Sequence, residues 1–177
     1  MSHTPIRTAL AVVAATLLTV SLTAQAKPNF SGRWTRVADP ADQAAAAAGM
    51  RGGRGRGMSG WGEDVTVKQD STSLTVVQTQ PDGTARTYVY KLDGSESSNE
   101  FPGRAGAPTK MLSRATWEGE TLVINNTIAV DMGGNAMTIT MKQVIAQDAK
   151  GTLTIDTTTG GMPGGQTMTS KAQYRKN

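Results

Sequence analysis

The chain has 177 residues and a net charge of +4, from 18 Lys and Arg against 14 Asp and Glu, a mild excess that identifies no partner. It contains no Cys, and its one His, His3, lies in a segment that we expect to be removed. A mature protein without imidazole or thiol excludes His-based catalytic triads, Cys nucleophiles and the usual zinc or copper sites. We therefore expect no metal site and no cofactor.

Residues 1–26 have the three parts of a secretory signal peptide. Arg7 precedes an apolar run over 9–22, and Ala24-Gln25-Ala26 has the small-x-small pattern of a cleavage site. The run is shorter than the roughly 20 apolar residues that span a bilayer, which argues against a membrane anchor. We expect a periplasmic or secreted protein without a membrane span, whose mature chain, 27–177, forms one domain.

The first predicted strand covers Asn29 to Thr35 and contains a Gly-x-Trp pair, Gly32 and Trp34. Residues two apart on a strand point to the same face. Gly32 allows a close approach to a neighbouring backbone, while the Trp34 indole fills the adjacent interior space. We predict that these two residues form a structural anchor.

A loop rich in Ala, Gly and Arg follows at about 39–62. Its alanine run, 44–48, can form one or two helical turns, because alanine is the best helix former. Its Gly-Arg part, which carries Arg51, Arg54 and Arg56, resembles RNA-binding segments but contains no aromatic residue for base stacking. We interpret it as a flexible cationic loop over one end of the domain, able to contact an anionic ligand or surface, and expect no nucleic-acid partner.

From Glu63 onward, segments of alternating apolar and polar residues are separated by Gly, Asp, Asn or Pro turns, which is typical of antiparallel strands. The polar stretch 95–108, interrupted by two prolines, is predicted to be loop or irregular edge. About nine strands result. The fold class is therefore all-β: an up-and-down meander of about 8–10 strands that closes into a barrel, with the first and last strands as neighbours.

The segment Phe30-Ser31-Gly32-Arg33-Trp34 resembles the G-x-W first strand of lipocalins and the wider calycin group. With 90–97 it also resembles small exported bacterial proteins that open on N-F-S-G-x-W. The resemblance implies a lipocalin-like barrel with a ligand-binding shape, and a cation from the last strand, Arg175 or Lys176, packed over the Trp. The chain lacks the disulfide common in secreted lipocalins, and the avidin set of biotin-binding residues cannot be located in it.

Four aromatic residues are predicted to line a ligand site: Tyr88, Tyr90 and Trp117 on inward faces, and Trp61 at the open end. The cationic residues of the 39–62 loop would add affinity for an anionic ligand. The nine methionines either fill the core or line an adaptable pocket.

We expect an exported, monomeric barrel that binds a small apolar or amphipathic molecule and is not an enzyme. The alternative is an envelope module that binds a protein, such as a protease inhibitor. The acidic pairs Glu63-Asp64 and Glu118-x-Glu120 suggest acid/base or Ca²⁺ chemistry, but solvated carboxylates are ordinary at strand starts and turns. A filled interior would favour the protein-binding alternative over the ligand carrier.

Overall fold

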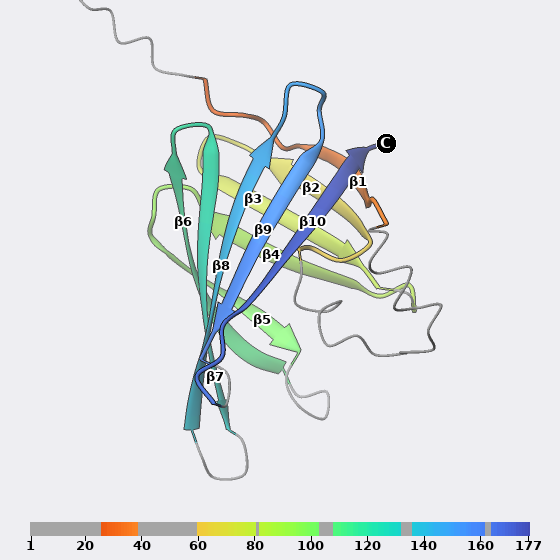
Figure 1. The fold of residues 1–177 in the computed structure, drawn as a ribbon. Helices are drawn as coiled ribbons and strands as arrows, with labels where there is room; N and C mark the ends of the chain where they lie inside the picture. The colour runs from red at the N-terminus through yellow and green to blue at the C-terminus, as the bar shows by residue number, and fades with distance from the viewer. Residues whose placement is uncertain (1–25, 39–59, 81, 103–107, 132–135, 162–163) are drawn as a thin grey trace, which may run out of the picture.

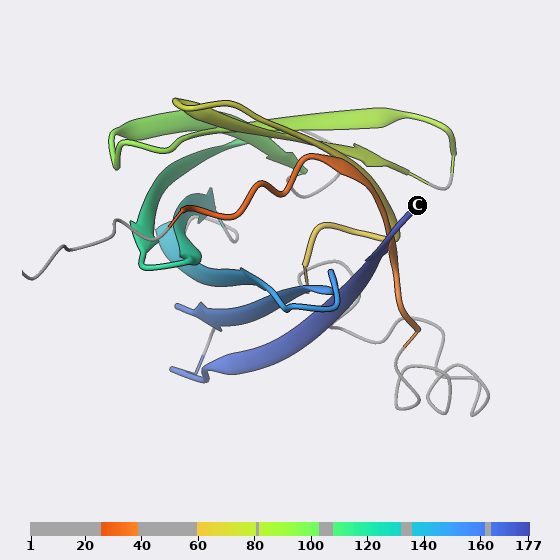
Figure 2. The same ribbon diagram turned by 90° about the horizontal axis from the view of Figure 1, so that it is seen from above.

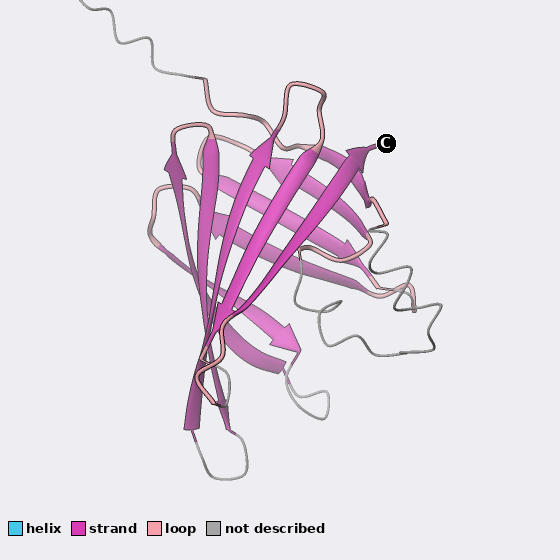
Figure 3. Ribbon diagram, viewed as in Figure 1, coloured by secondary structure: helices cyan, strands magenta, loops and turns pink. Residues whose placement is uncertain are grey.

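Ten antiparallel strands form one continuous sheet in the computed structural model, which describes residues 26–38, 60–80, 82–102, 108–131, 136–161 and 164–177 (Figure 1). The strands are β1 (Gly32–Arg36), β2 (Asp64–Gln69), β3 (Ser73–Thr79), β4 (Ala85–Lys91), β5 (Glu96–Pro102), β6 (Pro108–Glu118), β7 (Thr121–Asp131), β8 (Ala136–Gln147), β9 (Leu153–Gly160) and β10 (Met168–Lys176). The described residues contain strands, turns and loops but no helix (Figure 3). No helix in this part of the chain is long and apolar enough to cross a membrane.

The sheet order is β4-β3-β2-β1-β10-β9-β8-β7-β6-β5, so consecutive strands are neighbours and the first strand pairs with the last. Trp34 on β1 lies opposite Lys176 on β10, and Arg36 lies opposite Tyr174. The sheet curves back on itself around an interior that we call the lumen (Figure 2). The predicted fold class, an all-β up-and-down meander with the first and last strands paired, is confirmed.

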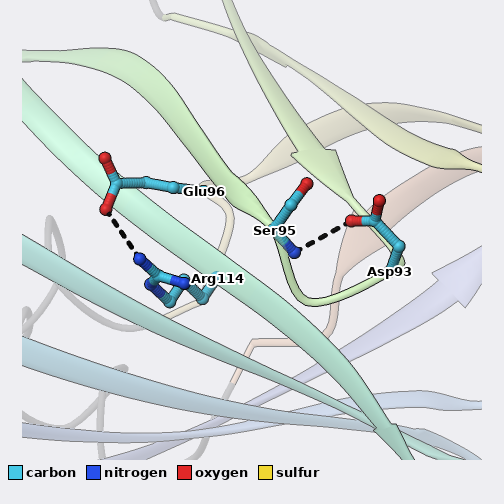
Figure 4. Close-up of polar contacts among 4 residues, drawn as sticks. All are labelled: Asp93, Ser95, Glu96 and Arg114. Atoms are coloured by element: carbon cyan, nitrogen blue, oxygen red, sulfur yellow. Dashed lines mark hydrogen bonds and ion pairs between the residues drawn. The ribbon is translucent and has the colours of Figure 1, made fainter.

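The barrel is nearly closed, because no backbone ladder joins β4 to β5 in the described residues. These two strands are instead linked by side chains of β5, Ser97 and Asn99, which bond to the β4 backbone. We call this junction the seam. The turn before it is held by Asp93, which accepts a hydrogen bond from the Ser95 N–H, and an ion pair between Glu96 and Arg114 lies on the outer face of β5 and β6 (Figure 4).

Successive connections of a meander lie at alternate ends of the barrel. The turn end carries the short connections of β2–β3, β4–β5, β6–β7 and β8–β9. The loop end carries the connections of β1–β2, β3–β4, β5–β6, β7–β8 and β9–β10. The internal segments outside the described residues all fall in connections of the loop end, and they include the predicted helical turns at 44–48.

Aspartates hold several of the turns. Asp70 accepts hydrogen bonds from the N–H groups of Thr72 and Ser73 at 2.7 Å each, and Asp148 accepts from Lys150 and Thr152. These hydrogen bonds favour the ionised carboxylate, chiefly through Thr72, and they lower the pKa of Asp70 to about 2. The Asp-rich turn chemistry in the sequence therefore fixes the strand register at the turn end.

Buried and exposed residues alternate along the strands, so that one set of side chains faces the lumen and the other faces solvent. On β4 Tyr88 and Tyr90 are buried while Val89 between them is exposed, and on β6 Met111, Ser113 and Ala115 are buried. These assignments agree with the predicted inward faces. The core consists largely of aromatic and branched aliphatic side chains that meet across this lumen.

Two features of the sequence prediction need correction. The stretch 95–108, predicted as loop or irregular edge, contains β5 and the start of β6, which raises the strand count from about nine to ten. Its polar residues indicated a loop, yet Ser97 and Asn99 face inward, where hydrogen bonds to β4 satisfy them. The first strand begins at Gly32 rather than Asn29, because the residues before it cross the turn end of the barrel.

Candidate functional site

The turn end of the lumen is covered by an aromatic cap. The Trp34 indole is fully buried and donates a hydrogen bond from Nε1 to the Phe30 carbonyl at 2.9 Å. Phe30 stacks on Trp117 with 5.7 Å between ring centroids, and Lys27 lies 5.6 Å from the Trp117 ring centroid. Trp117 therefore belongs to the cap, away from the loop end.

A lysine of the last strand lies over the buried Trp. The Lys176 ammonium is 5.5 Å from the Trp34 ring centroid, so the cation implied by the lipocalin resemblance is Lys176. Gly32 leaves room for it: a Cβ there would be 2.5 Å from Lys176 Cε, and the backbone φ of +145° also disfavours other residues. The close approach at Gly32 is thus to a lysine side chain, where the sequence had suggested a neighbouring backbone.

Trp61 lies inside the barrel wall, with only 1% of its surface exposed. Its backbone N–H donates to the Tyr174 hydroxyl at 2.7 Å, and that hydroxyl donates to the Gly62 carbonyl at 3.0 Å. Burial raises the pKa of Tyr174 to about 12. Gly60 packs so closely that a Cβ on it would be 2.8 Å from the Ala172 Cβ. The segment 60–62 is therefore held against β10 within the lumen.

A polar belt crosses the lumen wall on β5 to β9. Its members are buried polar side chains: Ser97, Asn99, Ser113, Asn126, Gln143, Thr157 and Thr159. The Ser113 hydroxyl donates to Asn126 Oδ1 at 2.7 Å, and Asn126 Nδ2 donates to Gln143 Oε1 at 3.5 Å. Cross-strand register explains these contacts, because Ser113 lies directly opposite Asn126, and Gln143 is two residues along β8 from Met141, the residue opposite Asn126.

Two buried donors of this interior have no hydrogen-bond partner among the described residues: the Thr157 hydroxyl and the Trp61 indole N–H. Thr157 lies opposite Ser170 on β10, two residues from Ala172, the residue against which Gly60 packs. An unpaired buried donor costs about 1–3 kcal/mol, so two on one wall are an unusual feature for a purely structural core.

An apolar rim lies on the loop-end side of the belt. Its members are apolar side chains on β6, β7, β8 and β10: Met111, Ile128, Val130, Met137, Ile139, Met141 and Met168. Burial decreases outward along it, since Met111 and Ile128 are buried whereas Met137 and Ile139 are partly exposed and Met168 is 41% exposed. Among the described residues, the rim provides apolar side chains at the loop end.

The β7–β8 hairpin extends past its neighbours at the rim. The β6–β7 ladder ends at the Met111–Ile128 pair and the β8–β9 ladder at Thr140–Gly160, whereas β7 and β8 continue to Asp131–Ala136. Val130 and Met137 therefore face each other on a part of the hairpin that pairs with no further strand among the described residues. Their partial exposure follows from this overhang.

The predicted ligand residues do not form one cluster. Tyr88 and Tyr90 are buried on β4, and burial raises the pKa of both hydroxyls, but Tyr90 lies opposite Leu74 near the turn end. Trp117 belongs to the cap, and Trp61 is buried inside the lumen against β10. The cationic residues of this prediction, Arg51, Arg54 and Arg56, lie outside the described residues.

Sequence reasoning missed the polar belt. Asn126, Gln143 and Thr157 stand within alternating strands, where polar residues were expected to face solvent. A signal was present in β9, whose Thr157 and Thr159 share a face with Leu153 and Ile155. Only the register reveals that such residues from five strands lie in neighbouring rows, since Ser97, Ser113 and Asn126 share one row and Gln143 and Thr157 share the next.

No protein-family model matches this chain, and no curated protein is significantly similar to it. The fold defines an antiparallel up-and-down β-barrel, nearly closed and compatible with a lipocalin-like barrel. Within the described residues, no three His, Cys, Asp or Glu side chains are grouped closely enough to hold a metal ion.

Proposed function

We propose that this protein is an exported, lipocalin-like barrel that binds a small, partly apolar molecule and catalyses no reaction. The observation that carries the proposal is the order of inward side chains along β6, β7 and β8, where apolar rim residues near the loop end are followed by polar belt residues, while the aromatic cap covers the turn end. A molecule entering at the loop end meets apolar surface first and hydrogen-bonding groups deeper in. Apolar walls with a few placed polar groups are typical of small-molecule sites.

The unpaired donors indicate the polar part of this ligand. The Thr157 hydroxyl and the Trp61 indole N–H both need an acceptor, and a carbonyl, carboxylate or hydroxyl oxygen supplies one. The Met side chains of the rim, Met111, Met137 and Met141, are flexible and polarisable, so they adapt to an irregular apolar partner. The expected ligand is therefore amphipathic, with an oxygen-bearing end directed into the barrel.

Dense packing inside the barrel favours the second candidate, a module that binds a protein through the loop end. Trp34, Trp61 and Tyr174 are among the largest fully buried side chains, and they occupy the space that a deep ligand would need. In this reading the overhanging β7–β8 hairpin and its exposed apolar face contact the partner. Both candidates use the same end of the barrel, and they differ in the size of the partner.

A fluorescence titration separates the two candidates. The panel contains fatty acids, phenolics, haem and tetrapyrroles, and calorimetry follows on any compound that changes Trp emission. Binding tighter than about 100 μM, roughly −5.5 kcal/mol, is expected for a cognate class. If every compound binds more weakly while a pull-down from envelope extract recovers one protein partner, the ligand carrier is rejected in favour of the protein-binding module.

Matched variants locate the bound molecule. Trp61→Phe is expected to remove much of the emission change, whereas Trp117→Phe, in the cap, is expected to keep it. Met137→Gln on the rim is expected to weaken binding, and Val89→Gln, an exposed apolar position on the outer face of β4, serves as its control. Equal effects of Met137→Gln and Val89→Gln would place binding away from the rim.

The proposed export is tested on the natural protein. Cleavage after Ala26 predicts a mature chain that begins at Lys27 in the periplasm or the medium. N-terminal sequencing of the soluble exported form measures this directly, and residues retained before Lys27 would contradict it.

A further inference from the structure

A surface depression lies at the turn end, outside the lumen and opposite the rim. Its volume is about 460 Å³, and it is formed by the β8–β9 turn and the end of β10. The lining residues are Gln147, Lys150, Gly151, Thr152, Arg175 and Lys176. This volume lies in the range of small-molecule sites, about 300–1,000 Å³.

The lining contains three cations and no carboxylate. Neither Lys150 nor Arg175 lies within ion-pair distance of an acid in the described part of the chain. Asp148 belongs to the same turn, but its Oδ1 accepts hydrogen bonds from the backbone N–H groups of Lys150 and Thr152. Asp64 on β2 accepts one from the Thr35 hydroxyl at 2.7 Å. Both carboxylates keep their negative charge while they accept these hydrogen bonds, but neither lies within ion-pair distance of Lys150 or Arg175, so the cations of the depression remain available to an anion.

One of the three cations is held in position by the fold. Lys176 lies over the Trp34 ring, and its side chain occupies the space left by the missing Cβ of Gly32. Contacts of this kind reduce the rotamer freedom that an exposed lysine loses on binding an anion. The ammonium is thus partly pre-organised at the wall of the depression.

We propose that this depression binds a small oxyanion, a phosphate group or a phosphomonoester. Arg175 offers planar paired donors that match phosphate oxygens, and Lys150 and Lys176 supply point charges. The Thr152 hydroxyl and the Gln147 amide add neutral hydrogen-bonding groups. Because the depression is larger than an inorganic ion requires, an organic phosphomonoester fits it better than phosphate alone.

The site is independent of the proposed lumen site, since it lies at the opposite end of the barrel. The experiment is an amide NMR titration with inorganic phosphate and with glycerol phosphate at low ionic strength. Saturable shifts confined to 147–152 and 175–176 are expected, larger for glycerol phosphate and reduced by added salt. Shifts that spread over all exposed lysines, or none at all, would overturn the proposal.

A charge-matched pair of variants tests the location. The double variant Lys150→Gln/Arg175→Gln is expected to raise the apparent Kd about fivefold, as the loss of two exposed charge contacts predicts. Its control, Lys68→Gln/Lys142→Gln, removes the same charge from exposed positions on β2 and β8. Equal weakening by the two double variants would reduce the effect to net charge and refute the site.

A vesicle arm distinguishes the source of the phosphate. Flotation with vesicles that contain phosphatidic acid, whose headgroup is a phosphomonoester, compared with phosphatidylcholine vesicles, reports a lipid headgroup, whereas binding of glycerol phosphate alone reports a soluble ligand. Binding to either probe that is weakened by Lys150→Gln/Arg175→Gln more than by the control supports the site. Absence of binding to both probes contradicts it.

Discussion

Asn99 on β5 binds Val89 on β4 as a backbone peptide would, because its amide pairs with both polar groups of that residue. The Val89 N–H donates to Asn99 Oδ1 at 2.8 Å, and Asn99 Nδ2 donates to the Val89 carbonyl at 3.0 Å. The neighbouring Ser97 hydroxyl accepts from the Lys91 N–H at 3.0 Å. Two side chains therefore satisfy the β4 edge at the seam, which would otherwise be open to pairing with another chain.

Asn99→Ala is expected to open the seam. The substitution leaves the Val89 N–H and C=O without partners, so the unfolding free energy should fall by about 1–3 kcal/mol. Hydrogen exchange at Val89 and Lys91 should accelerate more than exchange on β7 or β8. Ser98→Ala, an exposed position on the same strand, is the control. Unchanged protection at Val89 would mean that the amide does not close the barrel.

Trp34→Ala is expected to lower the unfolding free energy by about 3–5 kcal/mol, the range for large aromatic side chains removed from a core. Trp34 is fully buried, and the substitution also removes the ring beneath Lys176. Gly32→Val should destabilise as well, since a backbone φ of +145° strains a residue with a Cβ and the new side chain would displace Lys176 from the Trp34 ring. Chemical denaturation measures both, with Arg33→Ala, exposed on the same strand, as the control. A loss below about 0.5 kcal/mol for Trp34→Ala would contradict its role as an anchor.

The fold was predictable from sequence because strand alternation and turn chemistry are local signals. Tyr88 and Tyr90 could be assigned to one face from their spacing alone, and the Asp-rich turns set the boundaries. β5 was missed because its inward residues, Ser97 and Asn99, are polar, and their partners lie across the seam on β4. A polar residue faces inward only when a partner is supplied from elsewhere in the fold, and sequence alone does not show that partner.

The candidate site was less predictable for the same reason. Tyr88, Tyr90 and Trp117 were correctly placed on inward faces. Spacing along one strand, however, does not show at which position along the barrel axis a side chain lies. Trp117 proved to be part of the cap and Tyr90 to lie near the turn end, whereas the belt and rim depend on register between six strands, β5 to β10. Lys176 is a different case, because the lipocalin resemblance had already indicated a cation over Trp34.

The raised pKa of Tyr174 predicts that the folded protein loses stability in alkaline solution. Its pKa is about 12 in the folded protein against an ordinary value of 10.0, since burial disfavours the phenolate. Above pH 10 the unfolded chain releases the hydroxyl proton while the folded protein still holds it, which favours unfolding. The contribution of Tyr174 to the unfolding free energy is therefore full below pH 10 and is lost between pH 10 and about 12. Urea denaturation at a series of pH values should show the decline, and Tyr174→Phe should reduce it.

The same variant tests the hydrogen bonds of the Tyr174 hydroxyl. At neutral pH, Tyr174→Phe leaves the Trp61 backbone N–H and the Gly62 carbonyl without this partner. The unfolding free energy is expected to fall by about 1–3 kcal/mol. Tyr90→Phe is the comparison, because its hydroxyl is also buried with a raised pKa but bonds neither group. Identical pH profiles for wild type and Tyr174→Phe would show that the hydroxyl is not buried as described.

Gly60→Ala is expected to expel Trp61 from the lumen. The new Cβ would be 2.5 Å from the Tyr174 hydroxyl oxygen and 2.8 Å from the Ala172 Cβ, so the segment 60–62 has to leave the β10 wall. Trp61 then becomes exposed, and its emission should shift to longer wavelength with stronger acrylamide quenching. The Trp61 signal is obtained by subtracting the spectrum of the matching Trp61→Phe protein.

Gly62→Ala separates steric collision from backbone strain, since φ is +90° there but no atom lies within 4 Å of the added Cβ. A similar red shift in both variants would attribute the effect to strain, and unchanged quenching in Gly60→Ala would contradict the insertion of Trp61 into the barrel.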